Sequence, residues 1–490
     1  MQSEQQYSNL VYEYFLTRIQ FRYYKCGDCL PSIDTLCREL CVSAQTVKMA
    51  LKRLRSEGYI DMHNGRSTKV IFQQDQETSN QCILRYFSCR IHSFQDLFQS
   101  VGLIMHPLLT ESFYRADERD LACLARLAEG SCTDDVLHFF CFVLQKIDNP
   151  LVMNLYWEAS IYWGLLFLKH DDGKDLSDVA LLHDEIEHCV LLAENKEWNQ
   201  LARQLQIFRQ DSIGRAVDLL TQRIPPAENV EHIPFVWRIY RERPQVCYSL
   251  AAWLLHEIYI GCYREAEFLP SYENMAAAYG VSVSTIRRTV KVLNQLGAVR
   301  SINGKGTMVF GIGAHCDSPD FTSPVVRRNL AFFFQSFELL VYSCETVMQH
   351  CLSSASREEK SRLTSRLEQD LAHGRQELSL WRCLLFVTKC SPLKGIREIY
   401  GRIYSLFLWG YPLKASHDGN PALDEAILRF TDTMIQGLKG DDIAGCCQAI
   451  KILVTQQFPA AEQYLLNQGL QPEDLRLNPS IRLLISDEDT

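Results

Sequence analysis

Residues 30–72 read LPSIDTLCRELCVSAQTVKMALKRLRSEGYIDMHNGRSTKVIF, and residues 269–311 repeat them as LPSYENMAAAYGVSVSTIRRTVKVLNQLGAVRSINGKGTMVFG. The two stretches align at a constant offset of 239 without a gap. Identical pairs run through the whole length, among them Pro31/Pro270, Ser43/Ser282, Gly58/Gly297, Thr68/Thr307 and Val70/Val309. A gapless repeat of this length indicates one supersecondary unit that is used twice.

The repeated stretch predicts a short helix, a turn and a second helix. Ser32 suits the N-cap of the first helix, because its hydroxyl can accept a hydrogen bond from a free backbone amide. Gly280 suits a left-handed residue between the two helices, and Cys41 takes this place in the first copy. Ser43 and Ser282 stand where the second helix must be capped.

The second helix has two faces of different character. Its apolar face follows helical spacing and is formed by Val47, Leu51 and Leu54 in one copy and by Ile286, Val290 and Leu293 in the other. Its opposite face carries Gln45, Lys48 and Lys52 in one copy and Ser284, Arg287, Arg288 and Lys291 in the other. Gly58 and Gly297 end the helix, and alternating residues around Asn64-Gly65 then predict a β-hairpin.

In motifs and spacing, both stretches resemble the DNA-binding domain of the GntR family of bacterial transcription regulators. The family's characteristic runs stand in the first copy as Leu30-Pro31-Ser32, Cys41-Val42-Ser43, Thr46-Val47-Lys48, Leu54 to Gly58 and Gly65 to Thr68. In the second copy they stand as Leu269-Pro270-Ser271, Gly280-Val281-Ser282, Thr285-Ile286-Arg287, Leu293 to Gly297 and Gly304 to Thr307. The resemblance implies two winged helix-turn-helix domains, named here head 1 and head 2.

The resemblance also implies that the second helix of each head enters the major groove of DNA, while the wing meets phosphate or the minor groove. We expect DNA contacts in head 1 from Ser43, Gln45, Thr46, Lys48, Lys52, Arg66 and Lys69. In head 2 we expect them from Ser282, Ser284, Thr285, Arg287, Arg288, Lys291, Lys305 and Thr307.

Both heads depart from the family pattern at two positions. Ala44 and Val283 stand where the family usually has an arginine, and so do Asp34 and Glu273. These departures keep a second hypothesis open, in which the chain is a ligand- or protein-binding module with degenerate heads. Binding of the chain to duplex DNA distinguishes the two hypotheses.

The charge of the chain is unevenly distributed. The whole chain carries a net charge of −9, but residues 43–72 carry +4 and residues 282–311 carry +5, which leaves −18 on the remainder. Basic patches on an acidic body are typical of a protein that binds nucleic acid through part of its surface. We therefore expect double-stranded DNA as a partner.

Composition and motifs narrow the class of protein further. Nineteen cysteines without a recognisable signal peptide favour a reducing cytoplasm. Cys26, Cys29, Cys37 and Cys41 have a spacing that zinc sites use, but head 2 lacks these cysteines, so the heads should fold without metal. No apolar run reaches the length of a membrane span, and no phosphate-binding loop or catalytic motif is recognisable. We expect no membrane insertion, no cofactor and no enzymatic activity.

Length and polar stretches divide the chain into repeated parts. We predict head 1 at residues 1–75, a helical effector-like domain at 82–222, a connector at 223–246, head 2 at 247–312 and a second helical effector-like domain at 325–475. The polar residues 73–81 are expected to form a linker. The predicted fold class is therefore mainly α, with two winged helix-turn-helix domains each followed by an all-helical bundle.

The duplication continues into the helical regions. Ser93-Phe94 matches Ser336-Phe337 at an offset of 243, and Ile161-Tyr162 matches Ile403-Tyr404 at an offset of 242. These regions resemble the all-helical effector domain of the FadR-like branch of the family, which leaves control by a small-molecule effector open. The duplication predicts a pseudo-two-fold arrangement, in which one chain acts as an intramolecular pseudo-dimer on unequal half-sites. A homodimer of such pseudo-dimers also stays open.

Some effector domains of this branch bind a metal through an aspartate, a histidine four residues later and two further histidines. Asp134, His138 and His188 match part of this set in the first half. At the offset of 242, Gln376 and Leu380 stand opposite Asp134 and His138, so the second half lacks the set. We expect any metal or polar ligand in the first half, and polar residues without a ligand are the other interpretation.

Overall fold

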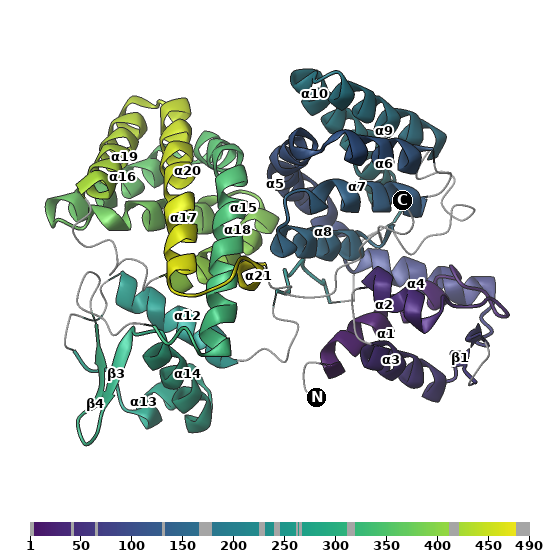
Figure 1. Cartoon of the computed structure of the whole chain (residues 1–490), viewed down its shortest axis with the longest axis horizontal. Coiled ribbons are helices and arrows are strands. Elements are labelled where there is room, and N and C mark those ends of the chain that lie inside the picture. Colours follow the sequence, from purple (N-terminus) through teal and green to yellow (C-terminus); the bar gives the residue numbers. More distant parts are fainter. Residues whose placement is uncertain are drawn as a thin grey trace. The chain divides into compact units, whose positions relative to one another are not determined.

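The computed structural model describes residues 4–40, 44–63, 67–129, 133–165, 179–224, 231–239, 246–260, 263, 267–310, 319–410 and 421–476. The chain forms two compact units, Met1–Arg243 and Pro244–Leu477. Within the described residues, each unit begins with three helices and a two-stranded sheet and continues with helices only (Figure 1). The expected mainly α fold, with two winged helices each followed by a helical bundle, is confirmed.

The two heads contain the same elements at equivalent positions. Head 1 contains α1 (Glu4–Gln20), α2 (Ile33–Leu40), α3 (Ala44–Ser56), β1 (Ile60–Asp61) and β2 (Lys69–Val70). Head 2 contains α12 (Val246–Tyr259), α13 (Tyr272–Tyr279), α14 (Val283–Gln295), β3 (Val299–Ile302) and β4 (Gly306–Val309). The bounds of α13 and α14 are those of α2 and α3 shifted by the sequence offset of 239.

The strand register of the two wings is also the same. In head 1 Ile60 pairs with Val70, and in head 2 the equivalent Val299 pairs with Val309. In each head a single-residue β-bridge also joins the wing to the segment before helix α2 or α13. Cys29 pairs with Lys69 in head 1, and Phe268 pairs with Met308 in head 2. The predicted hairpins are therefore confirmed, although Asn64-Gly65 and Arg66 lie outside the described residues.

The helix ends follow the chemistry that the sequence predicted. The backbone amide of Thr35 donates to the Ser32 hydroxyl at 3.0 Å, and that of Asn274 donates to Ser271 at 3.2 Å. Gly280 has a φ of +62°, a left-handed conformation that glycine adopts without the steric penalty of a side chain. This turn sets the angle between α13 and α14 in head 2. In head 1 the equivalent residues Cys41 and Ser43 lie outside the described residues.

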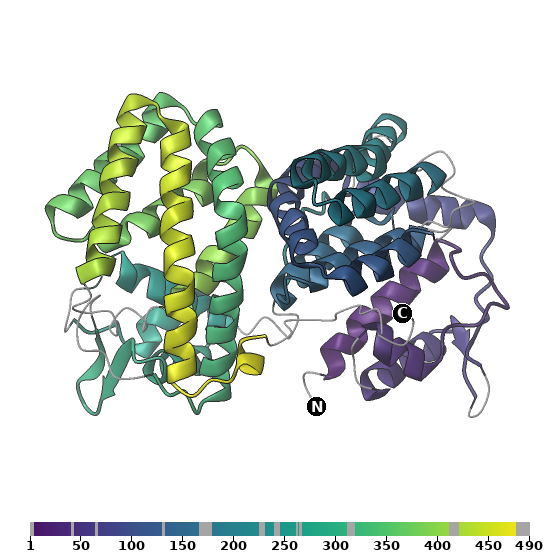
Figure 2. The same ribbon diagram turned by 45° about the horizontal axis from the view of Figure 1, so that its top comes forward.

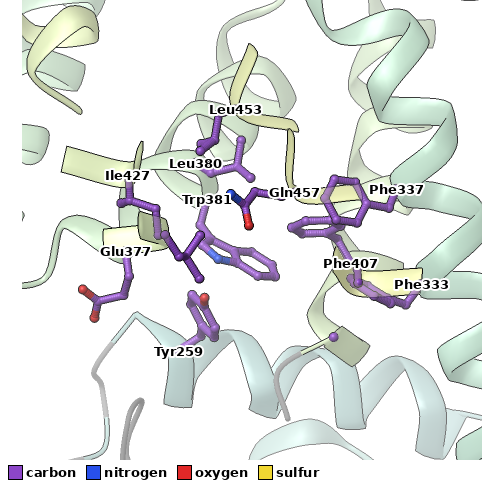
Figure 3. A pocket seen from close by; sticks show the side chains of 13 residues that line it. Tyr259, Phe333, Phe337, Glu377, Leu380, Trp381, Phe407, Ile427, Leu453 and Gln457 are labelled. Atoms are coloured by element: carbon purple, nitrogen blue, oxygen red, sulfur yellow. The ribbon is translucent and has the colours of Figure 1, made fainter. Parts of the chain in front are cut away.

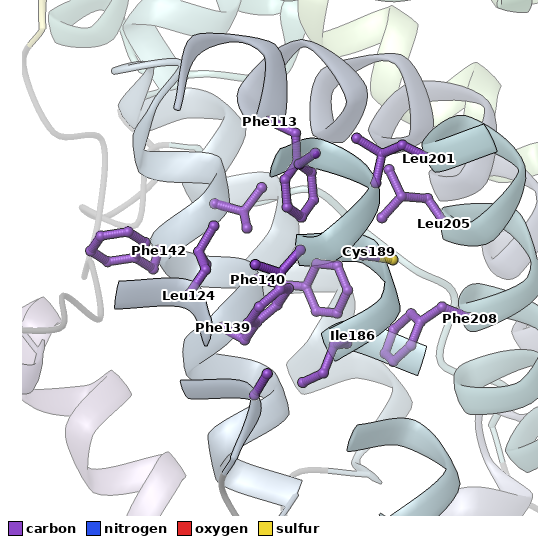
Figure 4. Close-up of a cluster of buried hydrophobic side chains, with 14 of the residues drawn as sticks. Phe113, Leu124, Phe139, Phe140, Phe142, Ile186, Cys189, Leu201, Leu205 and Phe208 are labelled. Carbon is purple, nitrogen blue, oxygen red and sulfur yellow. The ribbon is translucent and has the colours of Figure 1, made fainter. Parts of the chain in front are cut away.

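The bundle of the first unit has many short helices. They are α4 (Gln76–Ser88), α5 (Phe94–Arg115), α6 (Glu118–Ala128), α7 (Thr133–Gln145), α8 (Pro150–Trp163), α9 (Val179–Glu194), α10 (Trp198–Arg209) and α11 (Arg215–Arg223). A 3₁₀ turn (η1, Ile91–Ser93) precedes α5, and one turn of π-helix (η3, Gln210–Gly214) joins α10 to α11. The core between α5, α7, α9 and α10 is aromatic, with Phe113, Phe139, Phe140, Phe208 and Ile186 at its centre (Figure 4).

The prediction of a linker at 73–81 was wrong, because helix α4 begins at Gln76. Asp75 caps this helix, since its carboxylate accepts a hydrogen bond from the Thr78 amide at 2.7 Å. The fully buried Ser79 donates its hydroxyl to the carbonyl oxygen of Gln20 at 3.0 Å. The polar residues from Gln76 onward thus begin a helix of the bundle that is hydrogen-bonded to the last turn of α1.

The bundle of the second unit uses fewer and longer helices. They are α15 (Pro324–Ser354), α16 (Arg357–Ala372), α17 (Ser379–Cys390), α18 (Lys394–Phe407), α19 (Pro421–Gly440), α20 (Ile443–Asn467) and α21 (Pro472–Leu475), with a 3₁₀ turn η4 (Gln376–Leu378) before α17. The 31-residue α15 packs along the 25-residue α20 (Figures 1 and 2). None of the helices in the described part of the chain combines the length and apolar character that a bilayer crossing requires.

The predicted connector 223–246 is only partly a connector. Phe235, Trp237 and Ile239 are buried in the first unit, and the Trp237 indole donates to the Asn154 side chain at 2.8 Å. The amide of Ile233 donates to the carbonyl of Cys89 at 2.9 Å. Residues 231–239 are therefore a packed part of the first unit.

Candidate nucleic-acid interface

The third helix of each head, α3 or α14, corresponds to the second helix of the repeated stretch and packs on its head through a fully apolar face. In α3, Val47, Leu51 and Leu54 are each 0% exposed, and in α14 Ile286 and Leu293 are 0% exposed. Both helices pack on the first helix of their own head, α3 on α1 and α14 on α12. Because one face is fixed in this way, the orientation of the opposite face is fixed as well.

The opposite face of α14 is a stripe of exposed polar residues at helical spacing. Ser284, Arg287, Arg288 and Lys291 lie at positions i, i+3, i+4 and i+7 and are all exposed. In α3 the equivalent positions hold Gln45, Lys48, Met49 and Lys52, of which all but the half-buried Met49 are exposed. We name these two sets the basic stripes.

The start of α14 is ordered by serine and threonine side chains. The Ser282 hydroxyl accepts a hydrogen bond from the Thr285 amide at 3.2 Å and lies 2.8 Å from the Ser284 hydroxyl. The N-terminus of a helix carries partial positive charge and free amide groups, and both favour a phosphate. Ser282 and Ser284 are exposed at this end, so they lie where the predicted contacts require them.

Two predicted contact residues have to be revised. Thr46 is only 2% exposed and Thr307 only 3%, so their side chains are packing residues and not surface contacts. The Thr307 carbonyl accepts the Leu269 amide at 2.8 Å, which holds the wing against the rest of head 2. Ser43 and Arg66 lie outside the described residues.

The wings add further cations. Lys69 on β2 and Lys305 between β3 and β4 are exposed, as predicted. Arg300 on β3 is exposed too, with its guanidinium 5.1 Å from the Phe310 ring centre. Arg300 is not among the predicted contact residues, although its position in the predicted hairpin indicates an exposed wing cation.

Not every arginine of α3 belongs to the basic stripe of head 1. Arg53 forms an ion pair with Glu57 at 3.0 Å, and its guanidinium lies 3.7 Å from the Tyr12 ring centre. Arg53 therefore stabilises the contact between α3 and α1. Residue type alone does not separate such a cation from one that faces DNA.

The candidate metal ligands of the first half do not form a described site. Asp134 and His138 belong to α7, but their side chains lie outside the described ones, and His188 on α9 is exposed. The nearby His183 is buried, and its Nδ1 lies 2.7 Å from the Ala128 carbonyl oxygen. Among the described residues, no three His, Cys, Asp or Glu side chains are placed to hold a metal ion. The location of a metal or polar ligand in the first half stays a prediction.

A buried carboxylic acid occurs in the first unit instead. Glu185 on α9 is 8% exposed and is hydrogen-bonded to Asp211 in the π-helical turn η3. Burial is the main cause that raises the pKa of Glu185 to about 7, and the Asp211 carboxylate adds to the effect. The protonated form of Glu185 is therefore favoured in the folded chain below neutral pH.

Comparison with known proteins supports the interpretation of the heads. The family model described as "Bacterial regulatory proteins, gntR family" matches residues 8–70 and 249–309. Neither match reaches the helical regions, so their resemblance to the FadR-like effector domain stays a prediction. No curated protein matches the chain.

Solved structures of bacterial regulators are similar to parts of the chain. Streptococcus agalactiae GntR is 16% identical, with 44% of this chain and 99% of that protein covered and a TM-score of 0.21. E. coli McbR/YncC is also 16% identical, with 44% and 98% covered and a TM-score of 0.25. TM-scores this low carry no argument about the whole chain.

Proposed function

We propose that the chain, in which the gntR-family model matches residues 8–70 and 249–309, is a transcription regulator that binds one double-stranded DNA with both heads. The observation that carries the proposal is the pair of basic stripes on α3 and α14, which occupy equivalent positions on the corresponding helix of each head. Helices of this kind enter the major groove with their N-terminal residues at the base edges. A DNA partner also implies that the protein works in the bacterial cytoplasm.

We propose unequal half-sites for the two heads, because their basic stripes differ in chemistry. Gln45 in head 1 corresponds to Ser284 in head 2, and Met49 corresponds to Arg288. Glutamine can make two hydrogen bonds to adenine, whereas arginine makes its commonest specific contact with guanine. Head 2 therefore favours a more G-rich half-site than head 1.

We further propose that both heads act together because one chain holds them. Two binding modules on one chain raise each other's effective concentration, so avidity exceeds the affinity of either head. The segment 231–239 supports this arrangement, since it is packed on the first unit and leaves only a short stretch before α12 begins at Val246.

The test is to separate the heads without changing them. A protease site placed between Ile239 and Val246 allows the purified chain to be cut after folding, and duplexes are first selected from a random pool by the intact chain. On a duplex with both half-sites, the separated units should bind about 100-fold more weakly or worse. On a duplex with one half-site, cutting should change nothing.

Two results would contradict the proposal in different ways. Separated units that keep full affinity for the two-site duplex would show that the heads do not act as an intramolecular pair. A folded, intact chain that selects no duplex at all would favour the alternative of a ligand- or protein-binding module with degenerate heads.

We also propose that the helical bundles control the heads through the first helix of each head. In the first unit the hydrogen bond from Ser79 to the Gln20 carbonyl fastens α4 to α1. In the second unit His256 on α12 lies 2.6 Å from the Tyr404 hydroxyl on α18. A bundle that changes shape on binding a small molecule would therefore move the helix on which α3 or α14 packs.

A further inference from the structure

The second unit contains an aromatic cavity of about 160 Å³ between its bundle and the first helix of head 2. Its rings come from α12, α15, α17 and α18 and belong to Tyr259, Phe333, Phe337, Trp381 and Phe407 (Figure 3). Apolar cavities of about 150 Å³ accommodate a single benzene ring. The volume therefore suits a ligand with one ring and a short chain.

The polar groups of the cavity decide which charge such a ligand carries. Among the described lining residues none is basic, and Glu377 is the only acid. Gln457 extends its amide towards the space between Trp381 and the phenylalanine rings, whereas Glu377 stands at the edge near Tyr259 and Ile427 (Figure 3). A carboxylate ligand would meet no cation among these residues, whereas an ammonium group would meet aromatic faces, with the Glu377 side chain at the rim and its carboxylate directed away from the rings (Figure 3).

We propose that this cavity binds a small amine with one hydrophobic ring, held as a cation, and that its occupancy is transmitted to head 2 through Tyr259. The ring of the ligand lies against the wall that Phe333, Phe337 and Phe407 form together, their ring centres being 5.1–5.9 Å apart. Its ammonium group lies towards Tyr259 and Glu377. The role in control rests on the proposed function, but binding of the amine does not.

The cavity chemistry is particular to the second half. At the head offset of 239, Gln20 takes the place of Tyr259 in the first half. At the bundle offset of 242, His138 takes the place of Leu380, which lines the cavity. These two positions are thus polar in the first half and aromatic or apolar in the second, whereas the sequence predicts any metal or polar ligand in the first half.

Tyr259 joins the cavity to the DNA-binding helix in two steps. It is the last residue of α12, and its ring centre lies 4.2 Å from that of Trp381 in the cavity wall. Helix α12 in turn supports α14, where the buried Thr289 donates its hydroxyl to the Cys247 carbonyl at 3.3 Å. A ligand that presses on the Tyr259–Trp381 contact therefore changes the support of the basic stripe.

Two further contacts join the end of α12 to the bundle of the second unit. The Arg375 guanidinium donates to the Ile260 carbonyl at 3.2 Å, just beyond α12. Burial lowers the pKa of His256 and raises that of Tyr404, which favours the neutral form of both groups across the 2.6 Å contact between the imidazole Nδ1 and the phenol oxygen. The end of α12 is thus fixed to the bundle on both sides of Tyr259.

Binding is tested by calorimetry on the full chain with three probes of equal shape, 2-phenylethylamine, 2-phenylethanol and phenylacetate. The amine should bind one site per chain, and phenylacetate should bind at least about tenfold more weakly. Glu377→Gln should weaken the amine and leave the alcohol unchanged. Leu380→Phe fills the cavity and should abolish binding of the amine, while circular dichroism confirms that this variant folds. Absence of amine binding, stronger binding of phenylacetate, or an unchanged affinity in Leu380→Phe would overturn the site.

Coupling is tested by hydrogen exchange with and without 2-phenylethylamine. Exchange should change in residues 246–260 and 283–295, and Leu380→Phe should remove the change. Changes confined to the bundle helices would overturn transmission to head 2. Neither measurement uses DNA, so a chain that binds the amine but no duplex would refute the proposed function alone, and a chain that binds duplex but no amine would refute this inference alone.

Discussion

Arg287 and Lys48 provide the sharpest test of the basic stripes, because they occupy equivalent positions 239 residues apart and are both exposed. A cation that neutralises one DNA phosphate contributes about 0.9 to the slope of log affinity against log salt. Arg287→Ala should therefore reduce the magnitude of that slope by about 0.9. At about 0.15 M salt the release of one counterion corresponds to about 1 kcal/mol, or a Kd about fivefold higher.

The assay is a fluorescence anisotropy titration of a selected duplex over a series of salt concentrations. Lys48→Ala should cause the same loss of slope through head 1, and the double variant should lose about 1.8. Arg429→Ala is the matched control, since it removes one positive charge from an exposed side chain on α19 of the bundle. Its slope should equal that of the parent chain.

Neither substitution should change the folding of the chain. Both side chains are exposed, and exposed substitutions of this kind change the free energy of unfolding by about 0.5 kcal/mol or less. Weaker DNA binding with an unchanged unfolding midpoint would support the assignment. An unchanged salt slope in both single variants and in the double variant would refute it.

Three further predictions concern stability. Gly280→Ala should lower the free energy of unfolding of the second unit by about 1–2 kcal/mol, because φ is +62° there; Gly401→Ala within α18 is its control in urea denaturation and should not destabilise, since open space surrounds that position. Glu185 has a pKa raised from 4.5 to about 7, so the folded chain holds a proton that the unfolded chain has lost, and the stability of the first unit should fall as pH rises from about 4.5 to 7. Thermal unfolding of Glu185→Gln should show a smaller fall over this range, and an undiminished fall would contradict the assignment. Trp237→Ala should destabilise the first unit by about 3–5 kcal/mol and expose the connector to proteolysis, because the indole is 1% exposed; an unaltered rate of cleavage would contradict its role as an anchor.

The heads could be predicted closely because their determinants are local. Capping serines, a glycine with positive φ and helical spacing each act within a few residues, so Ser32 and Gly280 could be interpreted without a tertiary structure. Because the offset between the heads is constant, the strand register of one head also predicts the register of the other. The burial of Thr46 was not predictable in this way, because a short β-branched side chain at the boundary between two faces can belong to either.

The linker and the connector show where composition misleads. Residues 73–81 are polar, but the capping signal was present in Asp75, and the buried contact of Ser79 with Gln20 depends on residues 59 positions apart. In the connector, Phe235, Trp237 and Ile239 are buried and alternate with exposed residues, a pattern typical of an extended segment on a core. The prolines around this segment led instead to the prediction of a connector.

The cavity of the second unit was beyond prediction for a different reason. Its lining residues come from several helices between Tyr259 and Ala461, and an aromatic residue at helical spacing has the same pattern whether it fills a core or lines a cavity. Only the packing of complete helices decides between the two. The sequence therefore predicts the exposed polar stripes of the heads far better than the position of a cavity.

The two bundles show how one plan acquired two interiors. Phe94 begins α5 after a 3₁₀ turn, whereas its counterpart Phe337 lies within the continuous α15 and faces the aromatic cavity. In the first unit the Arg209 guanidinium instead donates to the Phe98 carbonyl at 2.9 Å, where α10 passes into a π-helical turn. A break in a helix repositions every side chain beyond it, so the halves no longer present equivalent residues inward. Duplication thus preserved the order and bounds of the elements in the heads, while each bundle has an interior of its own.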